Sequence, residues 1–169
     1  MAGGTRGVVV MSMMVATASV LHVVESWLPL PFPVPGAKLG LANIVTLVAL
    51  LWWGRNTALL IAVARVMLGS LFGGMLFGPA FAMALAGAIG SLLVMDTVRL
   101  FAAQRFSPVG LSVLGAAAHS VIQLVVAAVL VDSVGVLAYL PWLTLFAVPT
   151  GLFTGLVALS FMRHLRYAV

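Results

Sequence analysis

The chain has 169 residues, of which 64% are hydrophobic and 7% are charged, and its mean hydropathy is +1.28. This composition excludes a soluble globular protein and indicates an integral membrane protein. The length allows about six or seven spans of roughly 20 residues each, in a single membrane domain over residues 1–169 with no soluble catalytic domain. The net charge of +5 comes from basic residues scattered between apolar runs, which favours the positive-inside rule over nucleic-acid binding. Cysteine is absent, which excludes disulfides, thiol catalysis and thiolate metal sites.

Six apolar segments follow one another along the chain and predict an all-α membrane protein with six transmembrane helices. Their approximate ranges are 7–28, 38–53, 56–72, 79–103, 109–131 and 138–162. The second and third segments are short for a complete crossing of the hydrocarbon core. Basic residues flank alternate ends of these segments: Arg6, Arg55, Arg105, Arg163 and Arg166. With six spans they all fall on one side, so the positive-inside rule predicts that both termini are cytoplasmic.

A proline-rich segment separates the first two spans. Every second residue from position 29 to 35 is proline, including Pro33 and Pro35, which removes backbone donors and excludes a regular helix. Gly36 then permits a tight bend. A second outer turn, between the third and fourth spans, is rich in glycine and contains Gly74 and Gly78. We expect these two outer loops to cover a polar cavity and to gate it.

Small residues recur at helical spacing on several spans. They are Ser12 and Ala16 on the first, Ala82, Ala86 and Gly90 on the fourth, and Gly151 and Gly155 on the sixth. Such stripes let helices approach closely in lipid. The simpler interpretation is packing within one bundle. The alternative is a docking face for a partner membrane subunit, which suits Ser12 and Ala16 best.

Five polar or charged residues are predicted to lie in the outer half or the middle of the membrane: Lys38, Asn43, Arg65, His119 and Gln123. Ionisable residues at this depth are costly and are functional candidates by default. At a rise of about 1.5 Å per residue, Arg65 lies near the midplane, and His119 and Gln123 lie one turn apart on one helix face. Because Lys38 and Arg65 face a single nearby carboxylate, that of Glu25, the pattern favours an anionic or polar-headed ligand.

Each of these residues also has a structural alternative. Arg65 can form a buried ion pair with Glu25 or with Asp96. The neutral polar residues can instead form hydrogen bonds between neighbouring helices. Asp96 and Arg99, three residues apart near the inner surface, predict a stabilising pair rather than a site.

Catalytic signatures are absent from the sequence. There is no glycine-rich nucleotide loop, so the chain cannot couple ATP hydrolysis by itself. The acidic residues, Glu25, Asp96 and Asp132, lie on different segments, so no pair of carboxylates is spaced to hold Mg²⁺. No histidine pair has metal-ligand spacing. We therefore expect a protein that is not an enzyme and that has no metal or other cofactor.

Three stretches of the chain resemble one known family. Residues 35–47 read PGAKLGLANIVTL, residues 64–70 read ARVMLGS, and residues 110–123 read GLSVLGAAAHSVIQ. Together they resemble the Gx transporter family, whose members are also labelled heptaprenyl diphosphate synthase component I. One departure is Ser120, where the family usually has asparagine after the histidine.

The predicted size, the six spans and the polar outer half are similar to the substrate-binding S components of energy-coupling-factor (ECF) transporters. This resemblance implies a subunit of the prokaryotic cytoplasmic membrane that captures a small vitamin-like or isoprenoid molecule from outside. It implies that the five polar residues named above contact the ligand. It also implies that the face carrying Ser12 and Ala16 meets a transmembrane coupling subunit driven by two ATPases.

The synthase label suggests a different function, that of a non-catalytic accessory subunit of polyprenyl (heptaprenyl) diphosphate synthesis. Prenyl chain elongation must ionise an allylic diphosphate, which requires clustered aspartates that hold Mg²⁺. This chain has two aspartates, and they are far apart. A third hypothesis is a structural membrane partner whose polar residues only pack the bundle.

Overall fold

The computed structural model describes residues 5–27, 40–102 and 105–167. These residues form six α-helices and one 3-10 helix, with no strand among them. The helices are α1 (Thr5–Trp27), α2 (Leu41–Trp53), α3 (Arg55–Phe72), α4 (Pro79–Ala102), α5 (Pro108–Val131), η1 (Val134–Tyr139) and α6 (Leu140–Tyr167). Each α-helix coincides with one of the predicted apolar segments, which confirms the all-α prediction.

Within the described ranges, five segments are long and apolar enough to cross a membrane. They lie within α1, α3, α4 and α5, and over η1 and α6 together. The second and third apolar segments were both predicted to be short for a complete crossing. In the structure the two corresponding helices differ in length. α3 reaches 18 residues, whereas α2 has 13 residues and is therefore about 20 Å long, less than the hydrocarbon thickness of about 30 Å.

α2 is the central helix of the bundle. It packs against α1, α3, α4 and α6, and every residue from Val45 to Leu50 is buried. A helix that is apolar on most sides is buried among other helices or in lipid. Apart from Asn43 and Thr46, the sequence of α2 is apolar, which fits its buried position.

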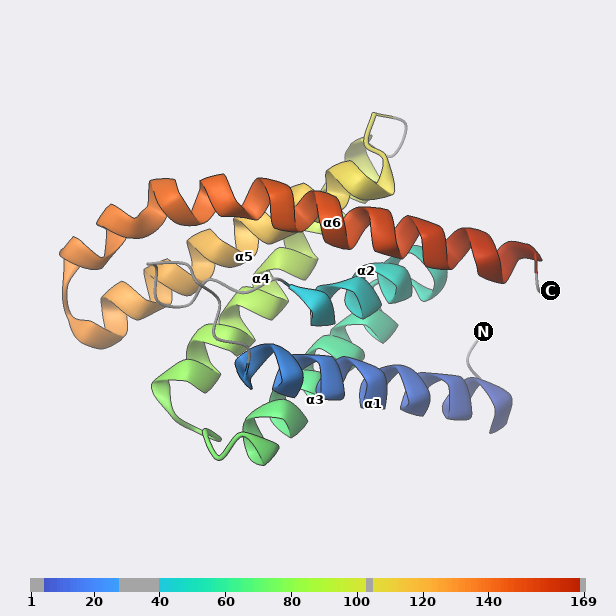
Figure 1. The fold of residues 1–169 in the computed structure, drawn as a ribbon, viewed down its shortest axis with the longest axis horizontal. Coiled ribbons are helices and arrows are strands. Elements are labelled where there is room, and N and C mark those ends of the chain that lie inside the picture. The colour runs from blue at the N-terminus through green and yellow to red at the C-terminus, as the bar shows by residue number, and fades with distance from the viewer. Residues whose placement is uncertain (1–4, 28–39, 103–104, 168–169) are drawn as a thin grey trace.

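The outer helices form a continuous series: α1 packs against α3, α3 against α4, α4 against α5 and α5 against α6. α1 and α6 run in opposite directions, and the start of α1 lies at the same end of the molecule as the end of α6 (Figure 1). The prediction that both termini lie on one side of the membrane requires this arrangement.

The predicted glycine-rich turn joins α3 to α4 through residues 73–78. Gly74 has a φ of 67°, a left-handed conformation in which a side chain would be strained. The Gly78 N–H donates to the carbonyl oxygen of Met75 at 3.1 Å and closes the turn. The turn is thus present, and the gating role of Gly74 and Gly78 stays a prediction.

The other predicted gating residues, Pro33, Pro35 and Gly36, lie outside the described residues. The same is true of Lys38, the predicted ligand contact nearest to them.

Glycines on α6 allow close contact with α5. A Cβ atom added to Gly151 would lie 2.5 Å from the Cα of Val113, and one added to Gly155 would lie 2.8 Å from the Cα of Val109. Only glycine permits this backbone-to-backbone approach. The small-residue stripe predicted on the sixth span is therefore a packing surface within the bundle.

Replacing Gly151 with alanine tests this packing. Alanine favours an exposed helix by about 1 kcal/mol over glycine, but here its Cβ would overlap the α5 backbone. We expect Gly151→Ala to lower the free energy of unfolding by about 1–3 kcal/mol, measured as a lower melting temperature in detergent. Gly135→Ala is the control, because its added Cβ meets its nearest atom, Ser133 Oγ, at an ordinary 3.5 Å. A Gly151→Ala variant as stable as the wild type would contradict the close contact.

Candidate ligand-binding cavity

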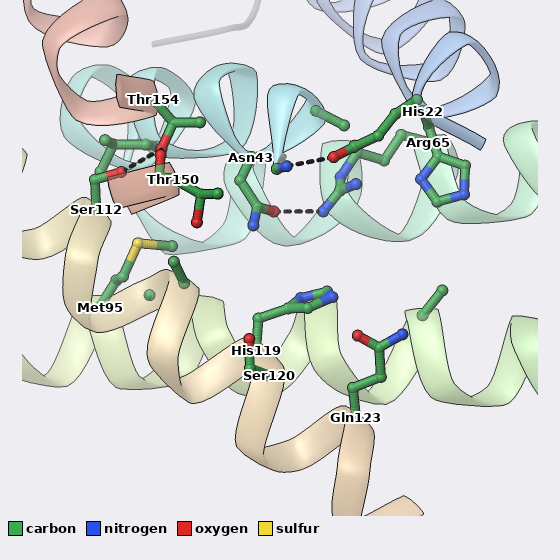
Figure 2. A pocket seen from close by; sticks show the side chains of 17 residues that line it. His22, Asn43, Arg65, Met95, Ser112, His119, Ser120, Gln123, Thr150 and Thr154 are labelled. Atoms are coloured by element: carbon green, nitrogen blue, oxygen red, sulfur yellow. Dashed lines mark hydrogen bonds between the residues drawn. The ribbon is translucent and has the colours of Figure 1, made fainter. Parts of the chain in front are cut away.

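All six α-helices contribute to a polar cavity with a volume of about 50 Å³ (Figure 2). Its lining is His22 and Glu25 from α1; Gly40, Ala42, Asn43 and Leu47 from the start of α2; Arg65 from α3; Ala84 and Met95 from α4; Ser112, Gly115, Ala116, His119, Ser120 and Gln123 from α5; and Thr150 and Thr154 from α6. The cavity therefore lies at the centre of the bundle, beside the first turns of α2.

Four of the five predicted ligand-contact residues line this cavity. They are Asn43, Arg65, His119 and Gln123, which come from three different helices. The structure thus brings together residues that are up to 80 positions apart in the chain. Lys38 is the fifth and lies outside the described part of the chain.

Arg65 is the charged centre of the cavity. It is buried, with 3% of its surface exposed. Its Nη2 donates to Oδ1 of Asn43 at 2.7 Å (Figure 2), and the nearby carboxylate of Glu25 stabilises its charge. Its Nε is also buried and has no hydrogen-bond partner among the described residues.

Glu25 links the end of α1 to the start of α2. Its carboxylate accepts a hydrogen bond from the backbone N–H of Gly40, the residue that precedes α2. Glu25 is 5% exposed. Of the two partners that the sequence left open for Arg65, Glu25 is therefore the one that the fold places beside it.

Asp96 belongs to a separate cluster. Its Oδ1 accepts hydrogen bonds from Arg99, at 2.7 Å from Nη2 and 3.2 Å from Nε, and its Oδ2 lies 3.8 Å from Nε of Arg55. The predicted stabilising pair of Asp96 and Arg99 is confirmed, and the contact of Asp96 with Arg55 joins α4 to the start of α3. Asp96 is engaged there, so the alternative pairing with Arg65 is wrong.

Glycines make room for the two histidine rings of the cavity. A Cβ atom added to Gly87 on α4 would lie 2.9–3.0 Å from three ring atoms of His119. A Cβ atom added to Gly69 on α3 would lie 2.4 Å from the ring of His22. The imidazole rings of His119 and His22 therefore lie directly against the helix backbone at these two glycines.

Three hydroxyl groups gather on the far side of Asn43 from Arg65 in Figure 2. Ser112 Oγ and Thr154 Oγ1 are 2.8 Å apart and join α5 to α6. Thr154 also donates to the carbonyl oxygen of Thr150 at 2.9 Å. Thr150 in turn donates to the carbonyl oxygen of Phe146 at 2.9 Å.

His22 and these hydroxyl residues were not predicted from the sequence as part of the site. His22 precedes Glu25 by three positions, which places both on one face of α1. Thr150 and Thr154 are four positions apart and lie next to the glycines that pack α6 on α5. The four-residue spacing shows that the two threonines share one helix face, but it does not show which way that face points.

Ser12 and Ala16, the predicted docking residues, are exposed on α1. Val9, Met13 and Val20 are also exposed on this helix, at 52%, 65% and 61%. The stripe on α1 therefore differs from the one on α6, because it is not covered by other helices of the described chain.

The long apolar helices and the buried polar cavity define a multi-pass membrane protein. The model of the heptaprenyl diphosphate synthase component I family matches residues 14–161, and the chain belongs to this family. The family expected from the sequence motifs is thus confirmed. No curated protein and no solved structure matches the chain.

The contact between Gly87 and His119 can be tested by a double-mutant cycle. Gly87→Ala is expected to push the His119 ring from its position and to lower the free energy of unfolding by about 1–3 kcal/mol. In a His119→Ala background the ring is gone, so the same change should be neutral or stabilising. Thermal unfolding in detergent of the four proteins measures the coupling. Equal effects of Gly87→Ala in both backgrounds would show that the ring does not lie on Gly87.

Proposed function

We propose that the protein is a substrate-capturing membrane subunit, similar to an S component, of an ECF-type uptake transporter. Its cavity binds a small molecule whose head group is rich in hydrogen-bond acceptors and carries at most one negative charge. The observation that carries this proposal is the buried Arg65, which enters the cavity with an Nε that has no hydrogen-bond partner among the described residues. A buried donor without a partner costs about 1–3 kcal/mol, and more if it is charged. A ligand acceptor would remove this cost.

Hydrogen-bond donors predominate around Arg65. Because Oδ1 of Asn43 accepts from Arg65, the amide nitrogen of Asn43 is left to donate. Gln123 adds a second amide to the lining. Gly40, Ala42 and Asn43 also place the N-terminus of α2 at the cavity wall, and the partial positive charge of a helix N-terminus favours an anion.

The charge balance limits the ligand. Glu25 already compensates the charge of Arg65, so these two residues together contribute no net charge. The fifth proposed contact, Lys38, would add one positive charge. A carboxylate or another singly charged head group suits this balance, whereas a diphosphate would bring excess negative charge into a low-dielectric interior.

In this proposal the ligand enters from outside, beneath the proline-rich loop and the Gly73–Gly78 turn, and the energy comes from other chains. A transmembrane coupling subunit would meet the exposed face of α1 that carries Ser12 and Ala16. ATPases would drive the cycle from the cytoplasmic face of a prokaryotic inner membrane. This proposal rests on the similarity in motifs and size described above and on the uncovered small residues of α1.

The family name favours a second candidate, an accessory subunit of polyprenyl diphosphate synthesis that is not itself catalytic. The acidic residues support the non-catalytic part of this description. Glu25 binds the start of α2, Asp96 pairs with two arginines, and Asp132 ends α5. Three carboxylates on separate elements do not form the cluster that holds Mg²⁺ against a diphosphate leaving group.

Native mass spectrometry of the detergent-purified protein tests ligand capture. We expect a small molecule to dissociate from the wild-type protein on mild activation. Arg65→Gln should lose it, because the charged donor is removed. Asn43→Asp should also lose it while the protein stays folded, because the new carboxylate pairs with Arg65 and repels an anion.

Arg105→Gln is the control for this experiment, since Arg105 is exposed and does not line the cavity. A ligand retained by folded Asn43→Asp at the wild-type level would contradict the assignment of an acceptor-rich ligand. A wild-type protein that carries no small molecule, but whose addition raises the activity of a prenyltransferase, would favour the accessory-subunit function instead.

We also propose that six spans place both termini in the cytoplasm. The absence of cysteine allows a direct test. Ser133→Cys, between α5 and η1, should react in intact cells with a membrane-impermeant maleimide, and Phe106→Cys, between α4 and α5, should react only after the membrane is opened. Both positions are exposed. Labelling of Phe106→Cys in intact cells would reverse the orientation.

A further inference from the structure

The hydroxyl groups at the Ser112 end of the cavity already donate their protons in hydrogen bonds within the protein. Thr150 donates to the carbonyl oxygen of Phe146, and Thr154 donates to that of Thr150. Each hydroxyl has a single proton. Because the proton of Thr154 is used by this carbonyl, Ser112 is the donor in the bond that joins the two hydroxyl groups.

This end of the cavity therefore offers only acceptors. Ser112 and Thr150 line the cavity, and each keeps oxygen lone pairs after its proton is bound within the protein. The opposite end is rich in donors, with Nε of Arg65 and the amide nitrogen of Asn43. At that end one carboxylate oxygen of Glu25 accepts from the N–H of Gly40, and the carboxylate faces the charge of Arg65. The two ends thus call for opposite hydrogen-bonding groups.

The cavity extends over about 10 Å along α5. Ser112 and His119 both line the cavity from α5, and seven residues of helix span roughly 10 Å. His119 lies near the Arg65 end in Figure 2. The lining also contains apolar side chains, those of Leu47, Met95 and Ala116. The cavity is also narrow, since its volume is only about 50 Å³.

The geometry points to a ligand with two different ends. One end is a carboxylate or a similar acceptor group held by Arg65 and Asn43. The other is a hydroxyl or amino group that donates to Ser112 and Thr150. A slim apolar linker joins them. This inference rests on the proposed function, and it makes Ser112 and Thr150 the residues that determine specificity at the second end.

Isothermal titration of the detergent-purified full chain with two series of probes tests whether the ligand has two different ends. One series is unbranched alkanoates, and the other is ω-hydroxyalkanoates of the same chain lengths. At the best-fitting length we expect the hydroxylated probe to bind the wild-type protein about tenfold more tightly, as one or two added hydrogen bonds would give. Ser112→Ala combined with Thr150→Val should abolish this preference and leave the affinity for the alkanoate nearly unchanged.

The matched control is Thr144→Val on α6. Thr144 makes the same kind of bond to a backbone carbonyl as Thr150, at 2.9 Å to Leu140, but it does not line the cavity. This variant should keep the tenfold preference. Thr150→Val alone should weaken the preference partly. This single variant replaces the double variant in the test if the double variant does not fold.

Equal affinity of the wild type for both probes would overturn the two-ended ligand and leave an anion-binding cavity in place. A preference that survives the double substitution would also overturn it, because the hydroxyl group would then be recognised elsewhere. If no probe of any length binds the folded wild type, the proposed anion-binding function fails together with this inference.

Discussion

The burial of one guanidinium group in an apolar bundle is the constraint on which the centre of this structure depends. Arg65 is almost fully enclosed by helices that are long and apolar enough to cross a membrane, where an uncompensated charge would be very costly. Compensation comes from two other helices, through the carboxylate of Glu25 on α1 and the amide of Asn43 on α2. Because Glu25 also binds the backbone at Gly40, the carboxylate that compensates Arg65 also ties α1 to the start of α2.

Glycine determines the shape of the space around this charge. Gly69 and Gly87 leave room for the rings of His22 and His119, and Gly151 lets α6 rest on the backbone of α5. These positions have little to do with flexibility, since they lie inside regular helices. The space that a side chain would occupy at each of these positions is filled by an imidazole ring or by the backbone of a neighbouring helix. The cavity therefore results from where small residues occur on α3, α4 and α6, as much as from the polar residues that line it.

The sequence predicted the helices and most of the charged centre, for physical reasons that also explain what was missed. Long apolar segments identify membrane helices because the bilayer requires them, and the constant rise of a helix gives the depth of Arg65, Asn43, His119 and Gln123. Depth does not give rotation about the helix axis, which depends on packing. For that reason Thr150 and Thr154 could not be placed in the cavity, and the choice between Glu25 and Asp96 as partner of Arg65 stayed open. The packing of α1 against α3 decides it.

The small volume of the cavity has a consequence for selectivity. A polar space of about 50 Å³ has room for roughly four water molecules, at about 10–15 Å³ each. In the absence of a ligand such waters would bind the lone pairs of Ser112 and Thr150 and the amide nitrogen of Asn43. Every ligand must then displace hydration that is already well bonded, and an analogue that cannot reproduce those bonds loses affinity on entry. A cavity of this size, once hydrated, would reject close analogues by the bonds that they fail to replace, without any steric barrier.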